Sequence, residues 1–188
     1  MLQEVVTHAT LGALFRYWDK KRGARRMPAR RDIDPIEMDR RFLPHLMLCE
    51  VAEDGDRIRF RLVGTALVKR LGIDPTGRFL ADLPPGKHFE FLAKLLRRVH
   101  AQAVPIYGES VFRWGLKGRL EARQLLLPLS ASGAATIVLV GAAYSSSDVF
   151  PPPILELNLV AKHAIVKCQG VKTPAPEPRR KPGSANVA

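Results

Sequence analysis

The sequence lacks the features that mark several specialised classes of protein. Its two cysteines, Cys49 and Cys168, have no spacing that suits a disulfide framework or a metal site, so we expect reduced thiols. No apolar run approaches the roughly 20 residues needed to span a bilayer. The N-terminus lacks the basic start and long apolar stretch of a signal peptide. We therefore predict a cytoplasmic protein with no membrane span.

Residue arrangements typical of enzymes are missing as well. The sequence contains no Ser-His-Asp arrangement, no phosphate-cradling glycine loop and no metal-ligand cluster. Asp32 and Asp34 could form a pair of carboxylates for acid–base chemistry, but a structural interpretation is stronger. Asp34 directly precedes Pro35, as in a helix cap, and Asp32 can pair with neighbouring arginines. We therefore predict no catalytic residue and no metal site.

Positive charge is in excess, with a net charge of +12 over 188 residues. Residues 16–31 hold eight basic residues against one aspartate, a net charge of +7, and the tail from Lys172 adds +3. Such runs attract nucleic acid or another anionic surface, or they form a solvated surface that maintains solubility, which we favour. Because 46% of the residues are hydrophobic, we expect one globular domain, followed by a disordered basic tail over residues 171–188.

The stretch from Arg57 to Arg78 shows the clearest local pattern. Apolar residues alternate with arginines along a half-buried strand: Ile58, Phe60 and Leu62 against Arg57, Arg59 and Arg61. Gly64 ends the strand, and Thr65 can cap a short helix that Gly72 stops. Asp74-Pro75 then resembles the start of a further helix, and Gly77 closes the unit.

Helical and strand periodicities predict the other elements. We expect helices over Val5 to Arg22 and over His88 to Ala103, and strands over residues 46–51, 104–114, 120–127 and 136–144. The last of these strands is apolar on both faces, which predicts a central, covered position, and its Gly141 would allow a close approach or mark a bulge. Residues 154–168 fit either a strand or a helix, and we favour a helix.

These elements, together with a set of short motifs, resemble the PAS domain, and in particular the stand-alone single-PAS proteins of alphaproteobacteria. The motifs are a Tyr-Trp pair, a basic P-x-R-x-D-I-D-P loop, a Leu-Pro strand start, an R-x-R-L-V-G-T strand end, a D-x-T-G-R turn and an L-L-L-P-L segment. This chain supplies them as Tyr17-Trp18, Pro28 with Asp32 and Asp34-Pro35, Leu43-Pro44, Arg59 and Arg61 with Gly64-Thr65, Asp74 with Gly77-Arg78, and, for the last segment, Leu126, Leu127, Pro128 and Leu129. The basic loop has one extra residue.

The resemblance implies an α+β fold, in which a five-stranded antiparallel sheet carries helices across one face, plus an N-terminal amphipathic helix. We divide the chain into an N-terminal helix (1–26), a PAS domain (27–150), a C-terminal helix or strand (151–170) and the tail. PAS domains bind small molecules, one another, or both. A ligand would lie inside the domain, against Phe60, Leu62, Leu67, Leu125 and Val138. A homodimer would form through Leu11, Leu14, Phe15 and Trp18, because their apolar face is wide for a free surface helix.

The resemblance also bears on cofactors. In photosensory PAS domains a reactive cysteine forms the flavin adduct, and Gly77 stands at that position, so we expect no covalent flavin. Haem-binding members use a histidine of the long helix, where His88 and His100 lie, but a lone helix histidine is more often structural, and we expect no haem. Arg59 and Arg61 could hold an anionic ligand, although an outward arginine face fits the strand pattern better.

The function that we predict is a non-enzymatic regulatory module that acts by contact with an unidentified signalling protein, with room for a small ligand. The alternative is a protein that binds nucleic acid or another anionic surface through its basic segments.

Overall fold

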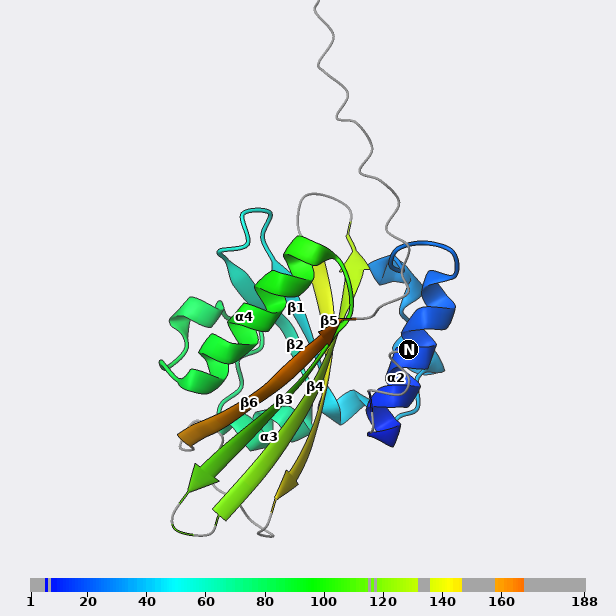
Figure 1. The fold of residues 1–188 in the computed structure, drawn as a ribbon. Coiled ribbons are helices and arrows are strands. Elements are labelled where there is room, and N and C mark those ends of the chain that lie inside the picture. Colours follow the sequence, from blue (N-terminus) through cyan, green and yellow to red (C-terminus); the bar gives the residue numbers. More distant parts are fainter. Residues whose placement is uncertain are drawn as a thin grey trace, which may run out of the picture.

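The computed structural model describes residues 6, 8–114, 116, 118–131, 136–146 and 158–167, the last range and residue 114 by their backbone alone. A mixed α+β fold is built around one antiparallel sheet with the strand order β2-β1-β5-β4-β3-β6 (Figure 1). The strands are β1 (Leu46–Val51), β2 (Ile58–Val63), β3 (Ile106–Trp114), β4 (Gly118–Ser130), β5 (Thr136–Ser146) and β6 (Asn158–Lys167). The first five strands are the sheet that the resemblance implied.

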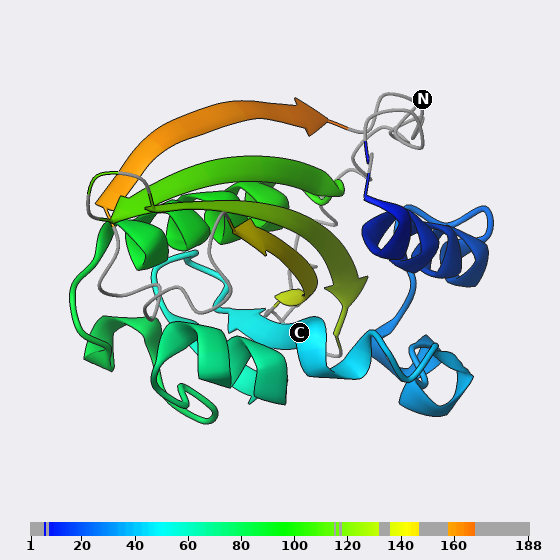
Figure 2. The same cartoon turned by 90° about the horizontal axis from the view of Figure 1, so that it is seen from below.

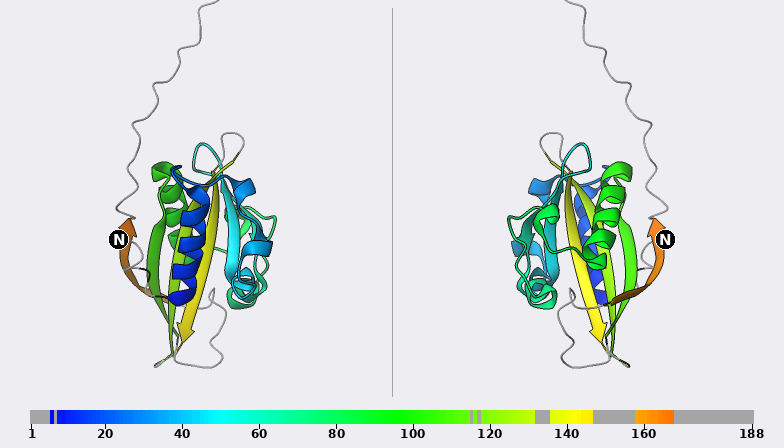
Figure 3. Two further views of the ribbon diagram at one scale, coloured as in Figure 1. Left: turned by 90° about the vertical axis from the view of Figure 1, so that its right-hand side faces the viewer. Right: turned by 90° about the vertical axis from the view of Figure 1, so that its left-hand side faces the viewer.

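Helices cover both faces of this sheet. The helices α3 (Thr65–Leu71) and α4 (Lys87–Gln102) pack against one face, which we call the inner face, and α2 (Ala9–Arg22) packs against the other, the outer face. Figure 1 shows α4 and α2 on opposite sides of the strands, and Figure 2 shows α2 from below. In Figure 3, α2 lies in front of the sheet in one view and α4 in the other. None of the described helices is long and apolar enough to cross a membrane.

Strand β5 lies in the middle of the sheet and is covered on both faces, as its sequence predicted. Val138, Val140 and Ala142 belong to the inner core beneath α3 and α4, whereas Leu139 and Ala143 belong to the outer core beneath α2. Successive side chains of a strand point to opposite faces, so an unbroken apolar run can supply two cores at once.

Gly141 of β5 allows α2 to approach the sheet closely. A Cβ atom at this position would lie 2.6 Å from Leu14 Cδ2 and 3.1 Å from Leu11 Cδ2. Further along α2, the Trp18 side chain is fully buried and its indole Nε1 donates to the Pro128 carbonyl oxygen at 2.9 Å. The outer core is therefore closed by the N-terminal helix of the same chain.

This packing corrects the dimer seam expected from the sequence. The four proposed seam residues are all buried within the chain: Leu11, Leu14, Phe15 and Trp18. The wide apolar face of α2 is explained by the outer face of the sheet, because β4 and β5 present leucines there that need cover. The argument for a partner helix at this face is thereby removed.

A bulge between β1 and β2 corrects a second expectation. Leu48 pairs with Leu62, but Cys49 pairs with Phe60, so Arg61 is an extra residue in β2. Beyond the bulge the alternation of faces reverses: Val63 is buried, and Leu62 points outward with 48% of its surface exposed. Leu62 therefore does not face the interior. Cys49 is a free, buried thiol in β1, and Cys168 lies outside the described residues.

The C-terminal segment, for which we favoured a helix, contains the strand β6. It pairs with β3 over pairs such as Tyr107 with Val166 and Val111 with Ala161. The alternation of leucines in this segment, which is typical of a strand, was thus a better indicator of its structure than the helical spacing of its other residues.

Gly64 permits a close contact that no other residue could make. Its amide donates to the Leu46 carbonyl oxygen at 2.8 Å, and a Cβ atom there would lie 2.5 Å from the Leu43 carbonyl oxygen and closer still to that of Pro44. Since both are backbone atoms, a side chain cannot be accommodated by a small rotation. The Leu43-Pro44 motif and the Gly64-Thr65 motif therefore pack directly against each other.

We expect Gly64→Ala to lower the free energy of unfolding by at least ~2 kcal/mol, because the added methyl group forces two backbone segments apart. The matched control is Gly12→Ala in α2, where the new Cβ would meet only ordinary contacts at 3.6 Å. That substitution should raise stability by about 0.5–1 kcal/mol through helix propensity. Urea denaturation of both variants measures the difference; equal effects would contradict the steric argument.

Candidate functional site

The Tyr-Trp pair of α2 holds two distant segments. The Tyr17 hydroxyl accepts from the Asp34 amide at 3.0 Å and donates to the Asp34 carbonyl oxygen at 3.2 Å. The neighbouring Trp18 bonds Pro128 of the L-L-L-P-L segment, as described above. One pair of residues therefore fixes both the basic loop and the end of β4 to the helix.

The two aspartates of the basic loop have the structural roles expected for them. Asp34 caps the 3₁₀ helix Pro35–Glu37, and its Oδ1 accepts from the Ile36 amide at 2.9 Å. The Asp32 carboxylate accepts from the Ala29 amide at 2.9 Å and pairs with Arg25 at 2.8 Å. The backbone hydrogen bond, followed by the one from Arg25, lowers the pKa of Asp32 below its usual value. Both carboxylates therefore hold groups of the basic loop and its neighbours in place.

The D-x-T-G-R segment forms a turn that pairs with the free edge of β2. Asp74 Oδ1 accepts from the Thr76 amide at 2.9 Å, and Gly77 adopts a φ of +81°. Beyond the turn, the Gly77 amide donates to the Phe60 carbonyl oxygen at 2.6 Å and the Phe60 amide donates to Arg78 at 2.9 Å. The segment covers an edge that would otherwise expose unpaired backbone groups.

Two local expectations for this region were wrong. Asp74-Pro75 begins a turn and not a helix, and Thr65 is the first residue of α3, whose N-cap is Gly64. The Leu43–Gly64 contact leaves no room for a side chain at the cap position.

Arg59 and Arg61 form the outward arginine face that the strand pattern favoured. Arg59 Nε donates to the Gly77 carbonyl oxygen at 3.1 Å, and its guanidinium lies 5.8 Å from the centroid of the Phe79 ring. Arg61 pairs with Glu50 of β1 at 3.0 Å. Both side chains thus make contacts within the chain on its exterior.

The structure does not bring the five expected pocket residues together. Phe60, Leu67 and Val138 are fully buried in the inner core. Leu125 lies in the outer core beneath α2, and Leu62 is exposed. The run L-L-L-P-L offers no alternation from which to tell its two faces apart, which explains why Leu125 was placed on the wrong one.

Polar side chains in the inner core form a candidate site that sequence reasoning missed. Four residues of the inner core have buried side-chain polar atoms without a hydrogen-bond partner in the part of the chain that the structure describes: His88, Ser110, Gln124 and Tyr144. We call them the inner polar set. The sequence indicated this set only through the polar residues Ser110, Gln124 and Tyr144, which occupy inner-face strand positions whose neighbours on that face are mostly apolar.

The strand register places three members of the inner polar set near one another. Ser110 on β3 and Tyr144 on β5 lie in one row across the sheet, on either side of Ala122. Gln124 lies in the next row, between Gly108 and Ala142. The residues between the polar side chains are therefore all small. His88 comes from α4 above the sheet, with its ring 5.6 Å from that of Phe112 of β3.

Burial keeps the titratable members of the set uncharged. It lowers the pKa of His88 to about 4 and raises the pKa of Tyr144 to about 12. Arg70 and Gln124 are close enough to Tyr144 to oppose this rise, although the Tyr144 hydroxyl makes no well-aligned hydrogen bond with the Gln124 amide. At neutral pH the inner core thus presents hydrogen-bonding groups without charge.

The other histidine of α4 is structural. His100 Nδ1 lies 2.9 Å from Thr136 Oγ1 at the start of β5, and its Nε2 lies 3.1 Å from the Glu53 carbonyl oxygen in the β1–β2 turn. The ring therefore joins α4 to both segments. No group of three His, Cys, Asp or Glu side chains within the described ranges is arranged to hold a metal ion.

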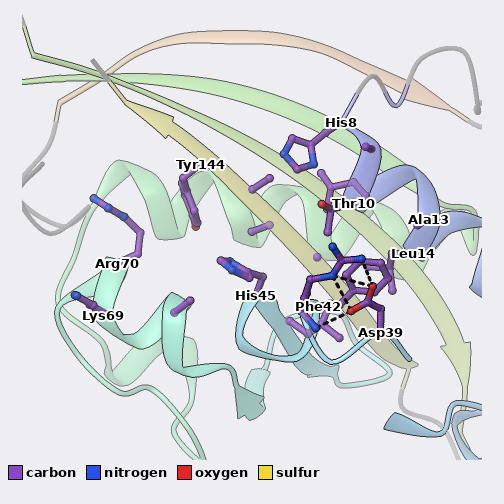
Figure 4. A pocket seen from close by; sticks show the side chains of 18 residues that line it. His8, Thr10, Ala13, Leu14, Asp39, Phe42, His45, Lys69, Arg70 and Tyr144 are labelled. Atoms are coloured by element: carbon purple, nitrogen blue, oxygen red, sulfur yellow. Dashed lines mark hydrogen bonds and ion pairs between the residues drawn. The ribbon is translucent and has the colours of Figure 1, made fainter. Parts of the chain in front are cut away.

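A cleft of about 840 Å³ lies outside the inner core (Figure 4). Its walls are the start of α2, residues 39–46, α3 and the end of β5. The cleft exists because β1 begins at Leu46, opposite Gly141, so that β5 continues beyond its neighbour. Tyr144 lines this cleft and also packs against the inner core.

The comparison with protein families decides the identity of this fold. A family model described as "PAS domain" matches residues 6–144. The chain belongs to the PAS domain family. PAS domains are in general sensory or regulatory modules without catalysis of their own. Neither the curated proteins nor the solved structures yielded a match.

The residues matched by the family model include α2, so this helix is part of the PAS domain. The matched region begins at residue 6, before the helix, and ends at residue 144, before β6. The contacts of Tyr17 and Trp18 agree with this extent, since α2 is joined to both the basic loop and the sheet.

His88 should make the stability of this PAS domain depend on pH. Between pH 6.5 and about 4 the unfolded chain binds a proton at His88 and the folded chain does not, so the free energy of unfolding falls as the pH falls. We expect wild type to lose about 2 kcal/mol more than His88→Phe between pH 7 and pH 4.5. Urea denaturation at both pH values measures this, with His100→Asn as the matched histidine control. Identical losses in wild type and His88→Phe would contradict the buried, neutral state.

Proposed function

We propose that this PAS domain is a non-enzymatic regulatory module that holds a small, uncharged polar molecule in its inner core and acts on another protein by contact. The observation that supports the proposal is the inner polar set. It lies on the inner face of the sheet, whereas the apolar residues predicted to line a pocket are packed against one another or lie elsewhere.

Unpartnered polar groups in a core are costly. A buried donor or acceptor without a partner typically costs about 1–3 kcal/mol, and native proteins satisfy nearly all such groups through protein, water or ligand. Here Ser110, Gln124 and Tyr144 surround Ala122, where the small side chain leaves the polar groups within reach of a common neighbour. A molecule with several hydrogen-bonding groups would satisfy them together.

The charge state of the core favours an uncharged ligand. The buried polar residues among those described are His88, Ser110 and Gln124, and none of them carries a charge at neutral pH when the His88 pKa is about 4. A charged ligand would require a countercharge in this low-dielectric site.

The same residues argue against catalysis. Ser110 is the only buried serine described, and its hydroxyl has no hydrogen-bond partner within the described ranges. A serine nucleophile needs a base within hydrogen-bond reach, and His88 does not contact it in this way. We therefore retain the non-enzymatic interpretation as part of the proposal.

The alternative, an anionic-surface binder, receives less support. Several basic residues of the segment 16–31 serve contacts within the chain: Lys21 pairs with Glu37, Arg22 with Asp19 and Arg25 with Asp32, and Arg26 donates to the Gln102 carbonyl oxygen. The charge of this segment is therefore less available than its composition suggested. A partner protein remains the proposed target of regulation, and self-association through α2 is not part of the proposal.

Native mass spectrometry of gently purified protein tests the proposal together with Gln124→Leu. We expect wild type to retain an added mass that denaturation releases, and Gln124→Leu to lose that mass and to unfold at a lower temperature. Leu125→Met, whose side chain lies on the opposite face, is the matched control and should retain the mass.

An inner core without a ligand predicts a different result for Gln124→Leu. If the inner core is dry, replacing an unpartnered amide by an apolar side chain of similar size should stabilise the protein by about 1–3 kcal/mol. No retained mass in wild type, combined with a stabilised Gln124→Leu, would rule the inner-core ligand out.

A further inference from the structure

Two exposed apolar side chains lie at the edge of the sheet that β2 forms. Among the described residues, four large hydrophobic side chains are exposed: Ile36, Leu62, Phe79 and Leu116. Leu62 belongs to β2, and Phe79 lies in the segment that pairs with this strand. Exposed apolar side chains that gather on one surface mark interaction sites, whereas single ones are ordinary.

The strand register places these side chains on one face. Leu48 and Glu50 are two residues apart on β1 and therefore point to the same face of the sheet. Their partners in β2 are Leu62 and Arg59, so both of these residues share the outer face. Phe79 forms a bridge with Arg59, and the centre of its ring lies 5.8 Å from the Arg59 guanidinium. We call Arg59, Leu62 and Phe79 the β2 surface.

The backbone edge of β2 is already paired beside this surface. The Gly77 amide donates to the Phe60 carbonyl oxygen at 2.6 Å, and the Phe60 amide donates to the Arg78 carbonyl oxygen at 2.9 Å. A partner at this edge would therefore meet side chains and could not simply add a strand to the sheet. Docking at the β2 surface depends on apolar contact and on charge.

Arg59 carries a charge that no carboxylate pairs with in the described part of the chain. Its Nε donates to the Gly77 carbonyl oxygen at 3.1 Å, and its guanidinium lies over the Phe79 ring. Both of these partners are uncharged. The terminal guanidinium nitrogens make no hydrogen bond within the described ranges, and such a group suits a carboxylate, which it can bind through two parallel hydrogen bonds.

The carboxylates nearest in the strand register and in the adjoining turn are engaged elsewhere. Glu50 lies opposite Arg59 but pairs with Arg61 at 3.0 Å. In the turn, the Asp74 carboxylate accepts from the Thr76 amide at 2.9 Å. The whole chain carries a net charge of +12, which attracts an acidic partner from a distance. An acidic partner is therefore favoured over a basic one at this surface.

We propose that the β2 surface docks an acidic segment of the partner protein, a proposal that rests on the proposed function of regulation by contact. A carboxylate of the segment binds the Arg59 guanidinium, and a neighbouring apolar side chain covers Leu62 and Phe79. A nucleic acid would supply negative charge without this apolar anchor. Two copies of a chain with a net charge of +12 repel each other, which disfavours a second copy as the occupant.

Selection from a phage-displayed library of random dodecapeptides on the full chain tests this surface. Peptides that also bind the double variant Arg59→Glu, Leu62→Gln are removed. We expect the remaining peptides to be enriched in aspartate and glutamate next to leucine, phenylalanine or tryptophan. Isothermal titration calorimetry with the synthetic peptides should then show one bound molecule per chain.

Two single variants locate the binding. Leu62→Gln and Arg59→Glu should each weaken it at least tenfold, through loss of the apolar contact and reversal of the charge. The matched controls are Ile36→Gln, at another exposed apolar residue, and Lys94→Glu, at an exposed lysine of α4, and both should bind within twofold of wild type. Far-UV circular dichroism confirms that each variant is folded.

A change in the peptide isolates the charge pair. Peptides whose carboxylates are replaced by amides should bind wild type and Arg59→Glu with equal affinity, because no charge then distinguishes the two proteins. A persistent tenfold difference would show that Arg59→Glu disturbs the surface in another way, and the carboxylate contact would be wrong.

Other results would overturn the proposal as a whole. If no peptide survives the removal step, the β2 surface does not dock such a segment. Equal losses in Arg59→Glu and Lys94→Glu would show general attraction to a basic protein, and equal losses in Leu62→Gln and Ile36→Gln would place the anchor elsewhere. Native mass spectrometry reports the inner-core ligand separately, so a chain without added mass that binds the peptides as expected would lose only that ligand.

Discussion

The docking of α2 on the outer face of the sheet is the interaction on which this architecture depends. Strands β4 and β5 carry leucines on both faces, and those of the outer face would be exposed without the helix. Burying a leucine side chain contributes roughly 1.5–3 kcal/mol, so several of them make the cover essential. Gly141 sets how closely the helix approaches, and the hydrogen bond from Trp18 to Pro128 fixes its position along the strand. The start of α2 then forms one wall of the cleft.

The motifs that resemble a PAS branch act as pairs of contacts between distant segments. The Tyr17 hydroxyl bonds the backbone of Asp34, and the backbone of Leu43 and Pro44 packs directly against Gly64. The Gly77 amide bonds Phe60 at the edge of β2. Each contact pairs backbone groups of distant segments or is possible only because glycine has no side chain. These residues therefore support the scaffold, and the polar groups available for a ligand are different ones.

Tyr144 lies where the inner core meets the cleft at the end of β5. Its ring packs against the inner core, lines the cleft and lies under the guanidinium of Arg70. A rearrangement of side chains in the inner core or in the cleft would therefore involve the Tyr144 side chain.

The sequence by itself determined the order of helices and strands along the PAS core, the covered position of β5 and the roles of local caps such as Asp34, because periodicity and capping depend on neighbours in the chain. It could not place Leu62 or Leu125, since a bulge reversed the alternation at one and an unbroken apolar run hid it at the other. It also could not show that α2 would be covered by its own sheet. The inner polar set and the cleft arise only when β3, β4 and β5 are brought together with α2, α3 and α4. Their chemistry depends on burial and on partners far away in the sequence. Tertiary structure alone decides such features, because whether a polar group is satisfied is a property of its surroundings and not of its position in the chain.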